Sequence, residues 1–334
     1  MKRYKLLNNV LGWVVFVIAA VTYILTLEST ASFWDCGEFI ASGYKLEVGH
    51  PPGNPIFMLT ARFFANFASS PSEVAYMVNL MSGLLSAATI LLLFWTITRL
   101  AQKIVLREGE TEETMSLGQM IAILGCGLVG ALAYAWSDTF WFSAVEGEVY
   151  AYSSFCTALV FWLILKWESV ADLPHANRYI ILIAYIIGVS IAVHLLNLLC
   201  IPAIVLVYYY RKYKNTDLKG SLIALLVSFV LIVLLLYGLV PGFVEVAGWV
   251  ELLFVNVFHL PFNSGVVFYF FLIVGVIAWA IYETYAQRSD KLIKISFLIS
   301  IVLVGIPFIG DGYIIGYLYS FYYLHISLLF QFYL

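Results

Sequence analysis

The most constraining feature of this sequence is a series of continuous apolar runs, each roughly 15 to 25 residues long, which is the length that spans a bilayer as a helix. These runs do not alternate between apolar and polar residues as barrel strands do, and only helices and closed barrels satisfy their backbone in lipid. With 63% hydrophobic and 11% charged residues, the chain is not a soluble enzyme, a nucleic-acid binder or a disordered polypeptide. We predict an all-α integral membrane protein, a polytopic helical bundle.

The apolar runs and their polar flanks predict about nine or ten transmembrane helices. The first run follows a basic start and is interpreted as an uncleaved anchor rather than a signal peptide. We treat residues 1–334 as a single transmembrane domain. The candidate spans are 10–27, 74–98, 118–137, 148–165, 179–193, 195–210, 221–240, 265–286, 295–310 and 313–330. The short pair 179–193 and 195–210 is expected to form a tight hairpin.

The basic residues fix the orientation of these spans. If the N-terminus is cytoplasmic, fifteen of the 17 basic residues lie on the cytoplasmic side, as the positive-inside rule requires. They are Lys2, Arg3, Lys5, Arg99, Lys103, Arg107, Lys166, Arg178, Arg211, Lys212, Lys214, Lys219, Arg288, Lys291 and Lys294. The outer face keeps Lys45 and Arg62 against eleven acidic residues, the last of which is Asp311. Residues 56–67 therefore do not cross, and we predict an interfacial helix with Ile56, Leu59, Phe63 and Phe67 on one face.

The first outer loop, residues 28–73, is the longest predicted segment outside the membrane and contains the strongest catalytic candidates. Asp35 and Glu38 are three residues apart, so in a helix their carboxylates share a face. Phe33, Trp34 and Phe39 are expected to hold that face at the bilayer surface. A carboxylate at such a boundary can serve as a general base. The alternative is a capping box in which both acids only stabilise the helix start.

Further candidates in this loop are a histidine and two cations. His50 precedes consecutive prolines, of which Pro51 is the first, and such a stiff turn would hold an imidazole against a substrate. An ordinary turn is the alternative. Arg62 and Lys45 are candidate partners for an anionic phosphate, although interfacial snorkelling explains either residue equally well. Glu73, with Ser70 and Pro71 before it, is interpreted as a structural cap.

The second outer loop and one apolar hairpin add the remaining candidates for substrate binding. Glu146, Glu148 and Tyr150 form an acidic group beside several aromatic residues. Glu148 could instead complement a helix dipole, and Glu146 could simply be solvated. His194 and Asn197 lie one helical turn apart in apolar sequence, where polar residues usually face a cavity or bond another helix.

The remaining titratable chemistry gives no metal motif. The four cysteines show no CxxC pairing, and three lie in apolar runs, so we expect buried small side chains rather than a disulfide or a zinc site. No metal ligands are assigned. A divalent metal on the acidic outer face stays open as an alternative.

Three segments together carry a family resemblance: FWDCGEFIASGYKLEVGHPPGNP, AVEGEVYAYSS and HLLNLLCIPAI. They resemble a multi-pass family of bacterial and animal proteins, long classed as a domain of unknown function, whose animal member is a protein O-mannosyltransferase. The resemblance is dense from about residue 10 to 215. That family in turn resembles the type C glycosyltransferases. These membrane enzymes use polyprenyl-phosphate sugars and keep an acid in the first outer loop; Asp35 stands at that place, beside Glu38.

The resemblance implies a glycosyltransferase that moves a sugar, mannose or another hexose, from a polyprenyl-phosphate donor to Ser or Thr of an exported protein. The expected setting is a bacterial inner membrane with the active site facing the periplasm. Bacterial relatives are often longer, with a soluble C-terminal region that is absent here, so we expect a truncated form. The alternatives are a multi-pass transporter or lipid flippase, for which His194 and Asp311 would be the intramembrane groups, and a non-catalytic envelope subunit.

Overall fold

The computed structural model describes residues 2–51, 53–286 and 289–305. Every regular element in these residues is helical, and seven helical stretches are long and apolar enough to cross a membrane. The predicted class, a polytopic helical membrane protein, is confirmed. The predicted span 313–330 and Asp311 lie outside the described residues.

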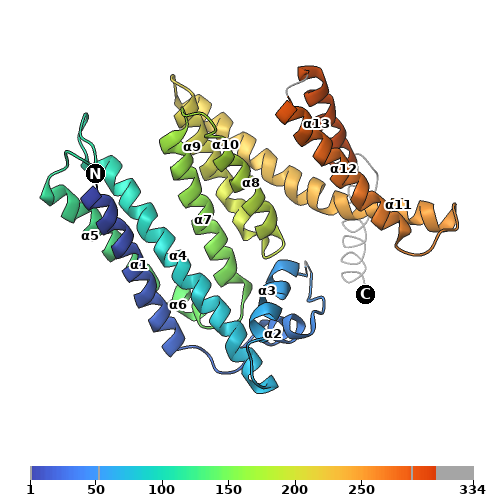
Figure 1. The fold of residues 1–334 in the computed structure, drawn as a ribbon, viewed down its shortest axis with the longest axis horizontal. Coiled ribbons are helices and arrows are strands. Elements are labelled where there is room, and N and C mark those ends of the chain that lie inside the picture. The colour runs from blue at the N-terminus through green and yellow to red at the C-terminus, as the bar shows by residue number, and fades with distance from the viewer. Residues whose placement is uncertain (1, 52, 287–288, 306–334) are drawn as a thin grey trace, which may run out of the picture. The chain divides into compact units, whose positions relative to one another are not determined.

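The helices follow one another along the chain with short connections, and Figure 1 labels most of them. Those up to the second outer loop are α1 (Lys2–Leu25), α2 (Cys36–Lys45), α3 (Pro55–Ala65), η1 (Pro71–Glu73), α4 (Val74–Val105), α5 (Leu117–Ala135) and α6 (Asp138–Ala144). The others are α7 (Val149–Val170), α8 (Arg178–Ile191), η2 (Leu195–Cys200), α9 (Ile201–Lys212), α10 (Leu218–Val233), η3 (Leu234–Leu239), α11 (Val240–Asn256), α12 (Ser264–Ala286) and α13 (Asp290–Gly305).

The seven stretches are fewer than the spans predicted from sequence, and helix length explains most of the difference. The α8 helix has 14 residues, or about 21 Å, which is short for a hydrocarbon core of about 30 Å. The α13 helix has 16 residues. Conversely, the predicted span 221–240 lies within a longer apolar helical stretch, Leu218–Asn256, which has 39 residues. A π-helical segment, η3, lies inside this stretch.

Helix α4 is the centre of the first part of the chain, with α1, α5 and α7 packed along it (Figure 1). It is the most buried of the seven stretches, with 56% of its apolar window inside the protein. Gly127 lets α5 approach closely, because a Cβ there would lie 2.5 Å from the Thr98 side chain. Small residues at a helix contact permit such tight packing in membrane proteins.

The first outer loop folds onto α4 as two short helices, α2 and α3. Helix α3 has 11 residues, about 16 Å, and is too short to span, as its flanking charges predicted. Its buried face consists of Phe57, Met58, Ala61 and Ala65. The predicted apolar face is largely exposed to the surroundings, with Leu59, Phe63 and Phe67 each more than half exposed. This is the arrangement that an interfacial helix needs.

The expected tight hairpin is present between α8 and α9. It turns through residues 192–194 and the 3-10 helix η2. The backbone N–H of Ile56, in α3, donates to the carbonyl of Ala192 at 3.0 Å. This bond ties the first outer loop to the tip of the hairpin.

The chain divides into two compact units between Leu225 and Leu226, whereas its hydropathy pattern predicts one transmembrane domain over residues 1–334. In the second unit, α11, α12 and α13 pack together. Glu251, one of the predicted outer acids, accepts hydrogen bonds from the backbone N–H groups of Asn263, Gly265 and Val266. It therefore caps the start of α12.

Candidate active site

Asp35 occupies the N-cap position of α2, yet its side chain makes no capping hydrogen bond. The preceding residue, Trp34, has a positive φ of 62° and is 95% exposed. A left-handed conformation costs a non-glycine residue about 1 to 2 kcal/mol. The helix start is thus not a capping box, and the exposed Asp35 carboxylate is available to react with a ligand.

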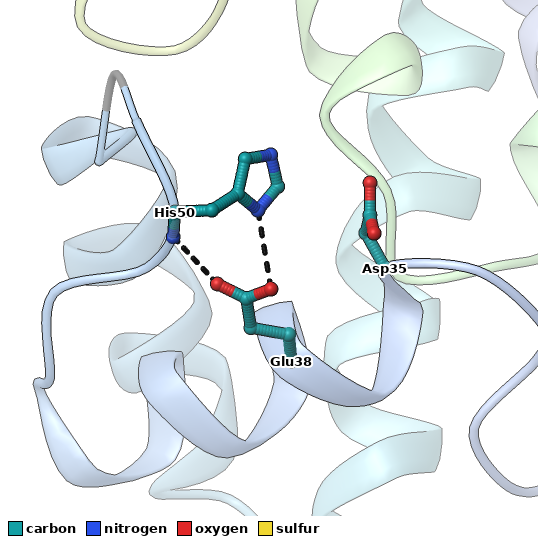
Figure 2. A group of neighbouring side chains, drawn as sticks. All are labelled: Asp35, Glu38 and His50. Atoms are coloured by element: carbon teal, nitrogen blue, oxygen red, sulfur yellow. Dashed lines mark hydrogen bonds and ion pairs between the residues drawn. The ribbon is translucent and has the colours of Figure 1, made fainter. Parts of the chain in front are cut away.

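Glu38, one turn into α2, binds His50 instead of the helix terminus. Its two oxygens meet the His50 backbone N–H at 2.6 Å and the ring Nδ1 at 3.1 Å (Figure 2). Both hydrogen bonds lower the pKa of the Glu38 carboxyl. The bond to Glu38 raises the pKa of the His50 imidazole, and the negative charges of Asp35 and Glu148 raise it further. The contact therefore favours the ionised carboxylate and the protonated imidazole.

The ring of His50 is positioned by a turn and by two aromatic contacts. The turn closes through a hydrogen bond from the Gly53 N–H to the His50 carbonyl at 2.8 Å, with Pro51 exposed in between. The ring packs 5.6 Å from that of Phe39, which in turn lies 5.2 Å from Phe57. The expectation that Phe39 faces the bilayer was wrong: it is buried, and its ring packs against that of the histidine.

Asp35 lies beside the Glu38–His50 pair on the same side of α2 (Figure 2). Each of the three residues offers one ligand atom, and these atoms lie within 4.8 Å of one another. Two carboxylates and one imidazole form a donor set that suits a divalent transition metal. The arrangement can thus accept a proton at Asp35, present a positive charge at His50, or hold a cation.

The second outer loop brings two buried acids to this region. Glu148 is 5% exposed and begins α7, where one oxygen accepts the Val149 N–H at 3.0 Å. The helix-terminus role that the sequence left open is therefore real. Burial raises the pKa of Glu148 to about 7, with further contributions from the charges of Glu146 and Asp35. The charges of Glu148 and Asp35 both act on His50, so the buried acid adds to the electrostatic potential at the Asp35 cluster, which consists of Asp35, Glu38 and His50.

Glu146 is buried, which excludes the alternative of a simply solvated side chain. Burial raises the pKa of its carboxyl, while hydrogen bonds with Ser32 and the Cys36 thiol lower it. Gly147 brings the segment close to α4, because a Cβ there would lie 2.9 Å from Asn79 Oδ1. The loop around Glu146 is therefore a packed part of the site.

Asn79 makes a structural contact that supports this region and that the sequence pattern did not predict. Buried in α4, it donates from Nδ2 to the carbonyls of Glu28 at 2.6 Å and Thr30 at 3.1 Å. It thus anchors the segment that leads into Asp35. Its signal was a single amide within an otherwise apolar run, which usually marks an interhelical or loop contact.

The two outer cations are engaged away from the cluster. Arg62 donates from Nη1 to the Tyr44 carbonyl at 2.6 Å and lies 5.1 Å from the Tyr44 ring, which joins α3 to the end of α2. Lys45 lies 3.9 Å from a carboxylate oxygen of Glu47. Within the described residues, neither forms an ion pair with a residue of the Asp35 cluster. The predicted role of Arg62 in substrate binding has no support in this geometry.

The candidates near the hairpin tip separate into a partly buried aromatic pair and a fully buried amide. Tyr150 and His194 pack edge to face, with ring centroids 5.5 Å apart, and His194 Nδ1 accepts the Leu196 N–H. Burial lowers the pKa of His194. Tyr150 is about half exposed and remains accessible to a ligand.

Asn197 is fully buried, and its amide bonds Thr157 in α7 and Ser190 in α8. Its Nδ2 donates to Ser190 Oγ at 2.7 Å, and its Oδ1 accepts from Thr157 Oγ1 at 3.1 Å. The structure thus favours the interhelical hydrogen bond that the sequence left open, and it removes Asn197 from the substrate-facing residues.

Comparison with known proteins gives one family for this chain. The family model described as "Protein O-mannosyl-transferase TMEM260 N-terminal domain" matches residues 35–217, which include the whole Asp35 cluster. Protein O-mannosyl-transferase TMEM260 of Mus musculus is 27% identical over 209 residues, covering 63% of this chain and 27% of the mouse protein. The Dictyostelium discoideum protein of the same name is 23% identical over 189 residues, covering 54% of this chain and 20% of that protein.

The matched region is therefore about a quarter or less of the length of these relatives. No solved structure shows a significant match to the chain.

Proposed function

Because this chain belongs to the family of the protein O-mannosyl-transferase TMEM260 N-terminal domain, we propose that it is the membrane part of a protein O-mannosyltransferase. The donor in this proposal is a polyprenyl-phosphate mannose or related hexose, and the acceptor is Ser or Thr of an exported protein. The observation that carries the proposal is the exposed Asp35 carboxylate, which makes no capping hydrogen bond and lies beside the Glu38–His50 pair, inside the region that the family model matches.

The proposed reaction has one proton transfer and one displacement. Asp35 takes the proton of the acceptor hydroxyl, and the hydroxyl oxygen forms a bond to the anomeric carbon. The bond from that carbon to the carrier phosphate breaks on the opposite face of the sugar, through an oxocarbenium-like state. The phosphate leaves with the electron pair of that bond, and the configuration at the anomeric carbon is inverted.

His50, rather than Arg62 or Lys45, is the cation placed to stabilise the leaving phosphate. Its raised pKa favours the charged ring, and Glu38 holds Nδ1 so that Nε2 is free to donate. Glu146 and Glu148 are largely buried. We assign them positioning roles, in which their charge adjusts the potential at Asp35 and His50.

A divalent cation is the alternative occupant of this cluster. The ligand atoms of Asp35, Glu38 and His50 are close enough to share one ion, and a bound cation would supply charge to a phosphate. The proton transfer to Asp35 proposed above does not require it. Removal and addition of a metal distinguish the two versions.

We further propose that the cluster faces the non-cytoplasmic side, which is the periplasm in a Gram-negative bacterium. The positive-inside rule supports this orientation, since the basic ends of α1, α4 and α7 lie away from Asp35. Asp35, Glu38, His50, Glu146 and Glu148 also lie outside the seven apolar stretches. A transporter or flippase would instead be expected to place its principal polar site within the spans.

The direct test is sugar transfer by membranes containing the full-length protein, given a polyprenyl-phosphate mannose and a Ser/Thr acceptor peptide. Asp35→Asn is expected to reduce transfer by about 100-fold or more, as removal of a general base does. Asp138→Asn is the matched control, since Asp138 is an exposed acid on the same face outside the cluster. Full transfer by Asp35→Asn would remove Asp35 from the reaction.

A further inference from the structure

A second polar site lies at the opposite end of the bundle from Asp35. A cavity of about 450 Å³ opens between the start of α1, the last turns of α4 and α7, and the loop that follows α4. Asp35 follows the end of α1 and Glu148 precedes α7, so the same helices separate the two sites. The proposed transfer reaction makes no use of this cavity.

The cavity has an excess of positive charge. Lys5, Arg99 and Lys166 line it, and Glu112 is the only acid among its described lining residues. Glu112 lies 3.7 Å from Lys5, at a position where both are partly exposed. Lys166 lies in no ion pair of the described residues, and its Nζ is 5.0 Å from the centre of the Trp162 ring.

The third cation, Arg99, is only partly neutralised. Its Nη2 lies 3.9 Å from Glu168, and the same carboxylate is engaged by Lys103 at 2.7 Å. Arg99 Nη1 donates to the amide oxygen of Gln102 at 3.2 Å. A planar guanidinium with weak partners can donate hydrogen bonds to the oxygens of a phosphate.

The other wall of the cavity is aromatic. The rings of Trp95 and Trp162 lie 5.9 Å apart and are tilted by 33°. Tryptophan is enriched at membrane interfaces, where one side of the ring meets lipid and the other meets polar groups. The side-chain oxygen of Asn8, also lining the cavity, is buried and has no hydrogen-bond partner within the described part of the chain. A ligand in the cavity could supply the missing hydrogen-bond donor.

We propose that this cavity binds the headgroup of an anionic glycerophospholipid from the leaflet at the basic end of the bundle. The phosphate would contact Arg99 and Lys166, and a headgroup hydroxyl would donate to the Asn8 oxygen. Basic clusters at the end of a transmembrane helix recognise anionic lipid in this way. The volume is in the range of sites for small ligands. A free phosphate shares the same recognition chemistry, and competition with inorganic phosphate distinguishes it from the lipid.

The test uses the full chain purified in detergent and analysed by native mass spectrometry after incubation with phosphatidylglycerol or phosphatidylcholine. The parent is expected to retain more phosphatidylglycerol than phosphatidylcholine. In Lys166→Gln the ratio of the two retained lipids should fall about fivefold. Lys166→Arg should restore it. Arg178→Gln is the matched control, because Arg178 also lies over an aromatic ring, that of Tyr179, but outside the cavity.

A second variant tests the space in the cavity independently of its charge. Ser169→Trp, at the cavity lining, keeps every charge and narrows the space, so it should also reduce retention of phosphatidylglycerol. Equal retention of the two lipids by the parent, or full preference in both Lys166→Gln and Ser169→Trp, would overturn the proposal. Displacement of phosphatidylglycerol by millimolar inorganic phosphate would overturn the lipid assignment in favour of a soluble anion.

Discussion

Glu38 accepts two hydrogen bonds from one residue, His50, through its backbone N–H at 2.6 Å and its ring Nδ1 at 3.1 Å. His50 lies twelve positions after Glu38, and the segment between them includes the end of α2 and a left-handed Leu46, which turns the chain back on itself. The contact thus holds the loop in place and favours the charged form of the ring. Because Asp35 lies one turn from Glu38, the pair also sets the electrostatic environment of the proposed base.

Replacing Glu38 with Gln is expected to move the pH dependence of sugar transfer. The carboxylate raises the pKa of His50, so the charged ring persists to higher pH in the parent. If the imidazolium stabilises the leaving phosphate, transfer falls as pH rises through the His50 pKa. In Glu38→Gln that fall should occur at lower pH. The pH–rate profile measures it, with Glu47→Gln, an exposed acid of the same loop, as the control; an unmoved profile contradicts the role of His50.

Glu148→Gln is expected to remove a pH-dependent component of stability. The pKa of Glu148 is about 7 in the folded protein, above its ordinary value of 4.5, so the folded state binds the proton more tightly. Its contribution is therefore present at low pH and is lost as pH rises from about 4.5 to about 7, by up to roughly 3 kcal/mol. Glutamine keeps an oxygen to accept the Val149 N–H.

Melting temperatures in detergent at pH 5 and pH 8 test this expectation. The parent should lose more stability between the two values than Glu148→Gln does. Glu73→Gln is the matched control, since Glu73 also accepts a backbone N–H, that of Ser69 at 2.9 Å, but is exposed. Equal pH dependence in the parent and Glu148→Gln would contradict the raised pKa.

The parts of this site that the sequence predicted are those set by spacing and charge. Flanking charges placed the first outer loop on one side, and the spacing of Asp35 and Glu38 put both acids on one helix face. The burial of Glu146 could not be predicted in this way. It depends on Gly147 approaching Asn79 in α4, a contact between residues far apart in sequence. The same holds for Phe39, whose burial depends on Phe57 in the next helix.

Gly147→Ala tests that close approach. The added methyl group would meet Asn79 Oδ1 at 2.9 Å, as well as Ile40 and Val78 at 3.2 Å. We expect a loss of about 1 to 3 kcal/mol in stability, as overpacking usually causes. Transfer should fall as well, because Asn79 anchors the segment before Asp35. Gly188→Ala, in α8 with open space around its position, should be neutral or slightly stabilising. An unchanged melting temperature in Gly147→Ala would contradict this packing.

Metal removal separates the two versions of the Asp35 cluster. If no cation is needed, EDTA-treated membranes should retain full transfer, and added Mn²⁺ should leave the rate unchanged. If a cation is held, transfer should be lost with EDTA and restored by Mn²⁺, and the restoring concentration should rise about 10-fold or more in His50→Gln.

Asn197 and Tyr150 were both predicted to contact substrate, and the structure gives them different expected phenotypes. Asn197→Ala breaks hydrogen bonds to Thr157 and Ser190 in a fully buried position, which should cost about 1 to 3 kcal/mol in stability. The KM of Asn197→Ala for the acceptor should equal that of the parent, because the buried amide has no access to a ligand. Tyr150→Phe keeps the ring packed against His194 and removes only the accessible hydroxyl, so it should leave the melting temperature unchanged. A raised KM in Asn197→Ala at parental stability would return that residue to the site, since a merely structural amide acts on KM only through folding.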